Sequence, residues 1–134
     1  MGKILGETLI SKEEIADICQ TLGRRITEDY AGKQVFLIGV LKGAFIFLAD
    51  LARNIDLPVD MDFISVSSYG GGTQSTGVVR IIKDVDQNIA GKHVIVVEDI
   101  VDSGLTLNHL KQLLSTRKPA SIALCTAFDK PERR

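Results

Sequence analysis

The chain has 134 residues, of which 45% are hydrophobic and 25% are charged, and its formal net charge is −1. This length and apolar content suit one domain with a single core. The near-neutral charge gives no electrostatic reason to expect nucleic acid or a membrane as a partner, and no apolar run is long enough to cross a bilayer. A small anionic ligand is still compatible with this composition, because it needs only a local cradle of donors.

The first predicted element is an amphipathic helix from Ser11 to Tyr30. Ser11 followed by Glu14 forms a capping box at its start. Four apolar residues share one face of this helix: Ile15, Ile18, Leu22 and Ile26. Residues 34–40 (QVFLIGV) form a short, branched apolar run, which predicts a buried strand ending at a glycine-containing turn. A second helix is predicted over residues 44–54.

The second half of the chain alternates strands with loops and one helix. Residues 59–67, where Asp60 and Asp62 alternate with apolar side chains, predict a strand. The glycine-rich tract that follows, residues 68–77, is typical of a flexible loop. The remaining predicted elements are strands over 78–83, 93–97 and 121–128, a turn over 86–91 and a helix over 105–116.

Strands that are apolar throughout and separated by helices predict an α/β fold with a mostly parallel central sheet flanked by helices. Residues 69–80 are expected to form a hairpin-type excursion from that pattern. Ligands of such sheets bind at the carboxyl ends of the strands. The chemistry is therefore expected after Val40, after Val97 and after Phe128, and polar residues follow at all three places.

The two cysteines, Cys19 and Cys125, lie far apart within apolar patterns. We interpret them as buried thiols in preference to a disulfide or a metal site. Because residues 1–10 do not have the pattern of a secretory signal, a cytoplasmic location is expected. Spacing suggests no partner for His93 or His109, so both are interpreted as structural or surface residues.

Residues 94–107 (VIVVEDIVDSGLTL) join the most apolar strand to a helix. The bend is formed by Ser103, Gly104, Leu105 and Thr106. Its backbone N–H groups point outward at the positive end of the helix, Gly104 allows a close approach, and two hydroxyls add donors. This arrangement predicts a cradle for a phosphate.

Two carboxylates, Glu98 and Asp99, come just before the cradle. They would repel the phosphate itself, but they suit ribose hydroxyls or Mg²⁺, so the segment predicts a sugar-phosphate site. An alternative is that Asp102 and Ser103 only cap the next helix, which leaves the upstream carboxylates without a role. A Walker-type loop is excluded because no G-x-x-x-x-G-K-[ST] segment occurs. Receiver domains carry a similar acidic pair, but on their first strand.

This segment resembles the fingerprint of the type I phosphoribosyltransferases. Three further segments are similar to the branch of that family that salvages 6-oxopurines: LKGAF at 41–45, SSYGGGTQSTG at 67–77 and DKPERR at 129–134. The resemblance covers essentially the whole chain and implies a single core domain over residues 1–134. The reaction it implies is transfer of the 5-phosphoribosyl group from phosphoribosyl pyrophosphate to hypoxanthine or guanine, with Mg²⁺, giving IMP or GMP and pyrophosphate. A regulator that senses phosphoribosyl pyrophosphate without catalysis is the alternative on the same fold.

The resemblance also implies a role for each residue of the central motif. Glu98 and Asp99 would bind the ribose hydroxyls, directly or through Mg²⁺, and Asp102 would act as general acid or base near purine N7. The residues from Ser103 to Thr106 would hold the 5′-phosphate. The pyrophosphate loop of the family matches Leu41, Lys42 and Gly43, and the peptide between the first two can be cis.

Further matches lie outside the central motif. Ser68 and Tyr69 match the mobile loop that closes over the site, and Arg134 matches an arginine near pyrophosphate. Lys130 matches the lysine that contacts the purine O6, and an ammonium, which has only donors, favours a 6-oxo over a 6-amino group. A homodimer or homotetramer is also implied. Because family members continue well past DKPERR, we expect much of the base-binding portion to be missing from these 134 residues.

Overall fold

In the computed structural model, residues 12–68, 79–101 and 104–129 are described. Helices and strands follow one another from one end of the chain to the other. In chain order they are α2 (Lys12–Asp29), β1 (Val35–Val40), α3 (Ala44–Ala52), β2 (Val59–Ser68), β3 (Val79–Lys83), β4 (His93–Val101), α4 (Gly104–Ser115) and β5 (Ser121–Asp129).

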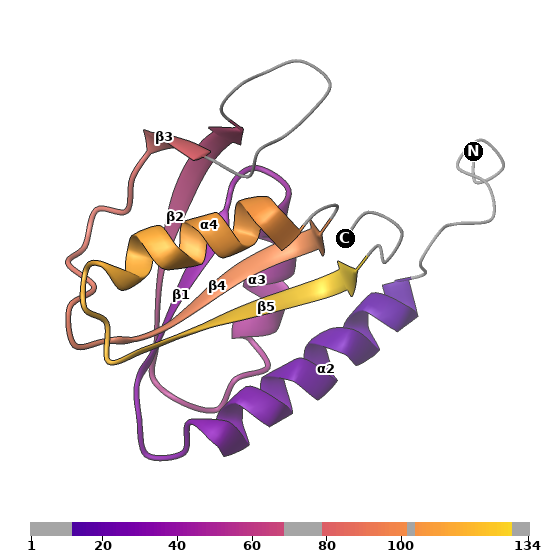
Figure 1. Cartoon of the computed structure of the whole chain (residues 1–134). Helices are drawn as coiled ribbons and strands as arrows, with labels where there is room; N and C mark the ends of the chain where they lie inside the picture. The colour runs from indigo at the N-terminus through magenta and orange to yellow at the C-terminus, as the bar shows by residue number, and fades with distance from the viewer. Residues whose placement is uncertain (1–11, 69–78, 102–103, 130–134) are drawn as a thin grey trace, which may run out of the picture.

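The described strands form a five-stranded sheet in the order β3-β2-β1-β4-β5 (Figure 1). β1 runs parallel to both β2 and β4, and β4 runs parallel to β5. β3 pairs antiparallel with β2. The predicted α/β class and the mostly parallel sheet are therefore confirmed. The antiparallel pairing of β3 agrees with the predicted hairpin-type excursion, of which residues 69–78 lie outside the described residues.

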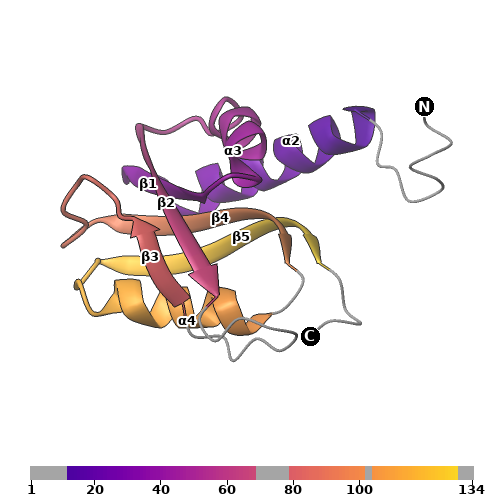
Figure 2. The same cartoon turned by 90° about the horizontal axis from the view of Figure 1, so that it is seen from above.

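Helices cover both faces of the sheet. α2 and α3 lie on one face and α4 lies on the other (Figure 2). All six residues of β1 are buried, and because successive side chains of a strand point to opposite faces, β1 contributes to both layers of the core. The layer under α2 and α3 includes Leu37, Leu48, Leu51, Ile95 and Val97. The layer under α4 includes Phe36, Ile38, Val94, Val96 and Leu110.

Most predicted bounds agree with the structure to within one or two residues. The exception is β4, which was predicted to end at Val97 and continues to Val101. Its last residues pair with β5, where Ile100 lies opposite Phe128 and Val101 lies opposite Asp129. The polar pair at 98 and 99 did not end the strand, because a neighbouring strand was available to pair with it. The capping box at Ser11 lies outside the described residues.

Acidic and apolar residues alternate over 59–63, but the acidic face of β2 is not uniformly exposed and its apolar face is not uniformly buried. Asp62 is only 8% exposed, whereas Met61 is 44% exposed. The buried carboxylate accepts backbone N–H groups from Asp86 and Gln87. The link between β3 and β4 therefore covers the acidic face of β2, a contact that no local pattern predicts.

None of the helices in the described ranges is both long and apolar enough to span a bilayer.

Candidate functional site

The register of the parallel strands brings two of the predicted motifs together. Val35 of β1 lies opposite His93 of β4, and this pairing continues to Gly39 opposite Val97. One further step along both strands places Val40 beside Glu98. The loop that starts at Leu41 therefore begins next to the acidic pair, although almost sixty residues separate them in the sequence.

β1 and β4 lie on either side of the point where the order of the strands in the sheet reverses. From β1 the chain passes through α3 to β2 on one side, and from β4 it passes through α4 to β5 on the other. The two connecting helices lie on opposite faces of the sheet (Figure 2). In open α/β sheets, ligands bind at the carboxyl ends of the strands at such a switch point. The predicted place of the chemistry agrees with this topology.

The central motif runs from β4 into α4. Glu98 and Asp99 belong to β4, and Glu98 is half-buried and lies opposite Thr126 of β5. Gly104, Leu105 and Thr106 form the first turn of α4. Free backbone N–H groups occur in the first turn of any helix and favour an anion there. The predicted phosphate cradle thus coincides with a helix N-terminus at the carboxyl edge of the sheet.

The predicted pyrophosphate loop is the short connection between β1 and α3. The peptide bond between Leu41 and Lys42 is cis, as the resemblance implied. The Leu41 backbone N–H donates to the carbonyl oxygen of Ile64 at 2.9 Å. Lys42 and Gly43 are exposed, and Gly43 is the N-cap residue of α3. The loop is anchored at its start and presents its next two residues to solvent.

Ser68 is the last residue of β2 and lies opposite Val79 of β3. It stands at the start of the predicted mobile loop. Other predicted site residues lie outside the described residues: Tyr69, Asp102, Ser103, Lys130 and Arg134. Their predicted roles stay predictions, and so do the side-chain roles of Asp99 and of the first turn of α4.

Among the side chains that the structure describes, no group of three or more His, Cys, Asp or Glu residues is placed to hold a metal ion. The predicted Mg²⁺ ligands, Glu98 and Asp99, are a pair of carboxylates at a ligand-binding edge. Carboxylate oxygens are the donors that Mg²⁺ prefers, and Mg²⁺ commonly takes one or two of them together with phosphates of the substrate. The donor chemistry therefore fits the predicted ion.

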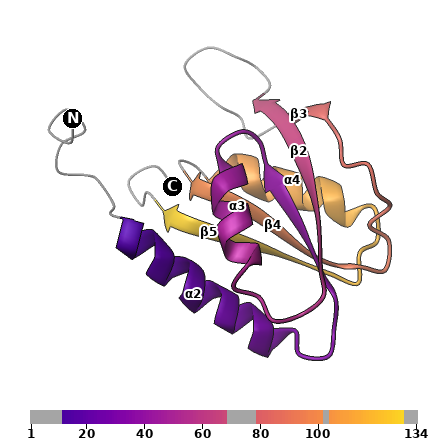
Figure 3. The same cartoon turned by 180° about the vertical axis from the view of Figure 1, so that it is seen from behind.

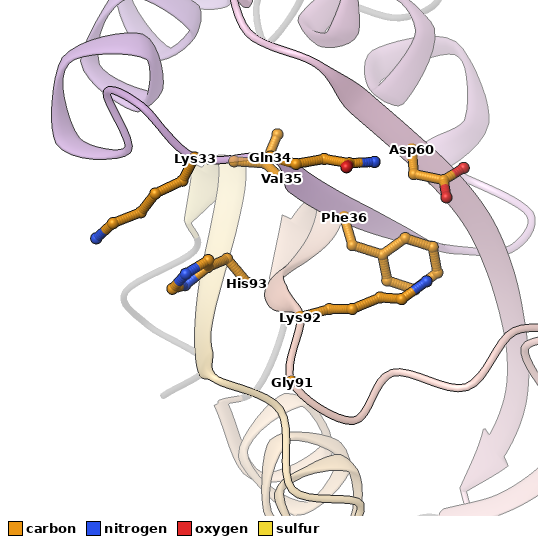
Figure 4. Close-up of a pocket in the computed structure, with 8 residues that line it drawn as sticks. All are labelled: Lys33, Gln34, Val35, Phe36, Asp60, Gly91, Lys92 and His93. Carbon is orange, nitrogen blue, oxygen red and sulfur yellow. The ribbon is translucent and has the colours of Figure 1, made fainter.

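A cavity of about 270 Å³ lies at the opposite, amino-terminal edge of the sheet (Figure 4). Two of its polar side chains, Lys92 and His93, have partners inside the chain. The Lys92 ammonium lies 5.0 Å from the centre of the Phe36 ring and 3.4 Å from Gln87 Oε1, and His93 Nδ1 lies 2.8 Å from Ser121 Oγ. We interpret this cavity as a depression between strand starts.

His93 also packs edge to face against Tyr30, so its predicted structural role is confirmed. His109 lies on α4, and its Nδ1 is buried with no hydrogen-bond partner in the described part of the chain. Cys19 and Cys125 are both buried free thiols, as predicted. Burial, and next to it the neighbouring Cys19, raises the pKa of Cys125 to about 11, so this thiol stays protonated at neutral pH.

The model of the phosphoribosyl transferase domain matches residues 7–134 of this chain. The chain belongs to the phosphoribosyl transferase domain family. The family that the motifs predicted is therefore confirmed, and the matched range includes both the predicted pyrophosphate loop and the central motif.

Relatives of this chain belong by name to the branch of the family that the segments at 41–45, 67–77 and 129–134 resemble. The hypoxanthine-guanine phosphoribosyltransferase of Streptococcus thermophilus is 50% identical over 134 residues, which cover 100% of this chain and 74% of that protein. The protein of the same name from Staphylococcus aureus is 46% identical and is covered to 75%.

Solved structures agree with this assignment. A hypoxanthine-guanine phosphoribosyltransferase from Bacillus anthracis superposes with a TM-score of 0.89 at 52% identity, over 96% of this chain and 76% of that one. A hypoxanthine phosphoribosyltransferase from Staphylococcus aureus gives a TM-score of 0.91 at 46% identity, over 96% and 70%. The predicted type I phosphoribosyltransferase fold is confirmed.

The sequence motifs assign no role to two residues of the central strands. Gly39 lies inside the fully buried strand β1, and Asp62 is the buried carboxylate of β2. A glycine within a central apolar strand was a usable signal, because it usually marks a bulge or a close approach of another segment. The burial of Asp62 had no comparable local signal.

Proposed function

We propose that this chain catalyses transfer of the 5-phosphoribosyl group from phosphoribosyl pyrophosphate to hypoxanthine or guanine, releasing pyrophosphate and IMP or GMP. The observation that carries the proposal is the register of β1 and β4, which sets the start of the Leu41–Gly43 loop beside Glu98, at the edge where α4 begins. A substrate with a pyrophosphate at one end and a 5′-phosphate at the other needs two anion sites flanking a site for ribose.

Each part of the substrate then has a group of residues to bind it. The first turn of α4, with Ser103, is proposed to hold the 5′-phosphate through backbone N–H groups and hydroxyls. Glu98 and Asp99 would accept hydrogen bonds from the ribose hydroxyls. The backbone of Leu41–Gly43 would bind pyrophosphate, with Arg134 as a further cation. Mg²⁺, held by Glu98 and Asp99 with the substrate, would neutralise charge on the departing pyrophosphate.

The purine is proposed to attack C1 of the ribose through N9. The bond from C1 to the pyrophosphate oxygen would break as the bond from N9 to C1 forms, and Asp102 would accept the proton from N7, so that the product ring is neutral. Lys130 would donate to O6. Closure of the loop that begins with Ser68 and Tyr69 would exclude water, which could otherwise attack the ribosyl centre.

We also propose that residues 1–134 form one core domain, since a single sheet supports both layers of the core, and that Lys130 is its contribution to base recognition. A homodimer or homotetramer is proposed on the resemblance alone.

The test is formation of IMP from hypoxanthine and phosphoribosyl pyrophosphate with Mg²⁺. Asp102→Asn is expected to lower kcat by about a hundredfold or more, because positioned acid–base groups contribute on that scale. The KM for phosphoribosyl pyrophosphate should change little, since Asn keeps the shape of the side chain. Asp86→Asn, in an exposed turn, is the matched control and should leave both constants unchanged.

Two outcomes would count against the proposal. If the chain binds phosphoribosyl pyrophosphate tightly but forms no nucleotide, the regulator on the same fold becomes the better explanation. If Asp102→Asn reduces kcat and sugar-phosphate affinity to the same extent, Asp102 serves mainly as the cap of α4.

A further inference from the structure

Gly39 lies in β1, one residue before the strand ends, and it has no room for a side chain. An added Cβ would lie 2.8 Å from Cδ2 of Leu48 and 3.2 Å from the ring of Phe63. Leu48 belongs to α3 and is fully buried, so its side chain has little space to move away. The absence of a side chain at Gly39 lets α3 pack more closely on β1 than any larger residue would permit. Figure 3 shows α3 beside β1.

This glycine stands where the fold would otherwise favour a branched apolar residue. Every residue of β1 is buried, and glycine weakens a strand because it packs no side chain and loses the most backbone entropy. Gly39 lies on the same face of β1 as Val35 and Leu37, which both belong to the core layer under α3. A close approach is a physical reason for glycine at such a place.

Leu48, the close contact, is the middle residue of α3 and lies one helical turn after the predicted pyrophosphate loop. α3 starts at Ala44, which is fully buried, and only Leu41, Lys42 and Gly43 connect it to β1. The Phe45 backbone N–H donates to the carbonyl oxygen of Lys42 at 3.4 Å, so the first turn of the helix and the loop are joined. A shift of Leu48, one helical turn after Ala44, moves the first turn and therefore the loop.

We propose that Gly39 is a positioning residue for pyrophosphate binding: the missing side chain sets the depth of α3 on β1 and thereby the place of Leu41–Gly43 beside Glu98. The inference rests on the proposed function, because that function assigns pyrophosphate to this loop. Gly39 acts through Leu48 and α3, without touching the substrate.

Gly23 of α2 provides a matched control at the other end of α3. A Cβ added there would collide with the backbone carbonyl oxygen of Asn54 and would lie 2.5 Å from its Cβ and 2.7 Å from its carbonyl carbon. Asn54 is the second residue after α3. Gly23→Ala therefore adds the same methyl group against the segment that follows α3, on the side away from the loop. It should lower the thermal stability without altering the loop.

The experiment compares the wild-type chain with Gly39→Ala, Gly23→Ala and the double variant Gly39→Ala/Leu48→Val, which removes the Cδ atoms that would collide. Steady-state kinetics would give kcat, the KM for each substrate and the inhibition constant of pyrophosphate, and calorimetry would give the Kd of pyrophosphate with Mg²⁺. Thermal melting of each variant would record stability separately.

We expect Gly39→Ala to raise the KM for phosphoribosyl pyrophosphate and the Kd of pyrophosphate about three- to tenfold, because small displacements of a binding loop weaken positioning. The KM for hypoxanthine should stay within about twofold. The double variant should recover most of the lost pyrophosphate affinity, whereas Gly23→Ala should lower Tm and leave every binding constant unchanged.

The inference is overturned if Gly39→Ala lowers Tm while pyrophosphate binding stays at the wild-type value, or if Gly23→Ala weakens binding equally. Failure of the proposed function has a different signature. A wild-type chain that binds pyrophosphate but forms no nucleotide would overturn the enzyme, and the effect of Gly39→Ala on the pyrophosphate Kd would still decide the role of Gly39.

Discussion

Asp62 has a buried carboxylate that connects two segments of the chain. Its Oδ1 accepts the backbone N–H of Phe63 at 2.7 Å, and its Oδ2 accepts those of Asp86 at 2.7 Å and Gln87 at 3.3 Å. The Lys83 ammonium lies 3.9 Å from Oδ1. These contacts hold the link between β3 and β4 against the acidic face of β2, so a residue that resembles a surface acid in the sequence is part of the framework.

Replacing Asp62 should therefore destabilise the fold. Asp62→Asn replaces one carboxylate oxygen with an NH2 group, which cannot accept the backbone N–H groups that point at it, and the remaining amide oxygen is a weaker acceptor than a carboxylate oxygen. We expect the free energy of unfolding to fall by about 1–3 kcal/mol. Asp60→Asn is the matched control on the same strand face. Asp60 accepts only the N–H of Met61 among the described contacts, so a change within about 0.5 kcal/mol is expected. Denaturant titration of both variants measures the difference, and equal stabilities would contradict the role given to Asp62.

At the scale of elements, the link between β3 and β4 is also tied to the end of α4. The Arg117 guanidinium donates from both NH groups to the two oxygens of Asp84, each at 2.8 Å. The hydrogen bonds from Arg117 hold the pKa of the Asp84 carboxyl below its usual range. The pair joins residues 33 positions apart and positions the connection that leads into β4.

Arg117→Gln is expected to lower stability at neutral pH by up to about 1 kcal/mol, since both partners are partly exposed and solvent screens the pair. A lowered carboxyl pKa contributes stability above the unfolded-state pKa, and the contribution disappears as pH falls through the folded-state value. The difference between wild type and variant should therefore vanish in strong acid. Melting curves across the acidic range test this. Arg25→Ala, which removes an exposed pair at 3.8 Å, should have no measurable effect at any pH.

At the scale of the whole molecule, the reactivity of the two cysteine thiols measures how far the fold has opened. Cys19 on α2 and Cys125 on β5 belong to the same core layer. Burial, and then the charge of Asp50, raises the pKa of Cys19, and the pKa of Cys125 is about 11. A buried, protonated thiol is a poor nucleophile.

Neither thiol is expected to react with an alkylating reagent in the native protein at neutral pH. Labelling of both should rise together with denaturant, in step with loss of helical circular dichroism. An engineered cysteine at Ser115, which is exposed at the end of α4, should react at once and serves as the control. Rapid native-state labelling of Cys125 would show that β5 opens without the rest of the fold.

The sequence by itself determined the family and the order of the elements, and it predicted the chemistry of the central motif. Hydrophobic periodicity is a local property, so the α2 helix and the buried strands were predictable from their own residues. The prediction of a phosphate cradle was equally local, because such a cradle needs only a strand, a glycine-containing bend and a helix start.

Only the tertiary structure decided which distant segments meet. The register of β1 against β4 places Leu41 beside the acidic pair, the link before β4 buries Asp62, and the approach of α3 leaves no space for a side chain at Gly39. These contacts depend on pairing and packing between elements far apart in the chain, which no local pattern encodes. The proposed site lies at the carboxyl edge of the sheet because the fold brings the ends of β1 and β4 together there.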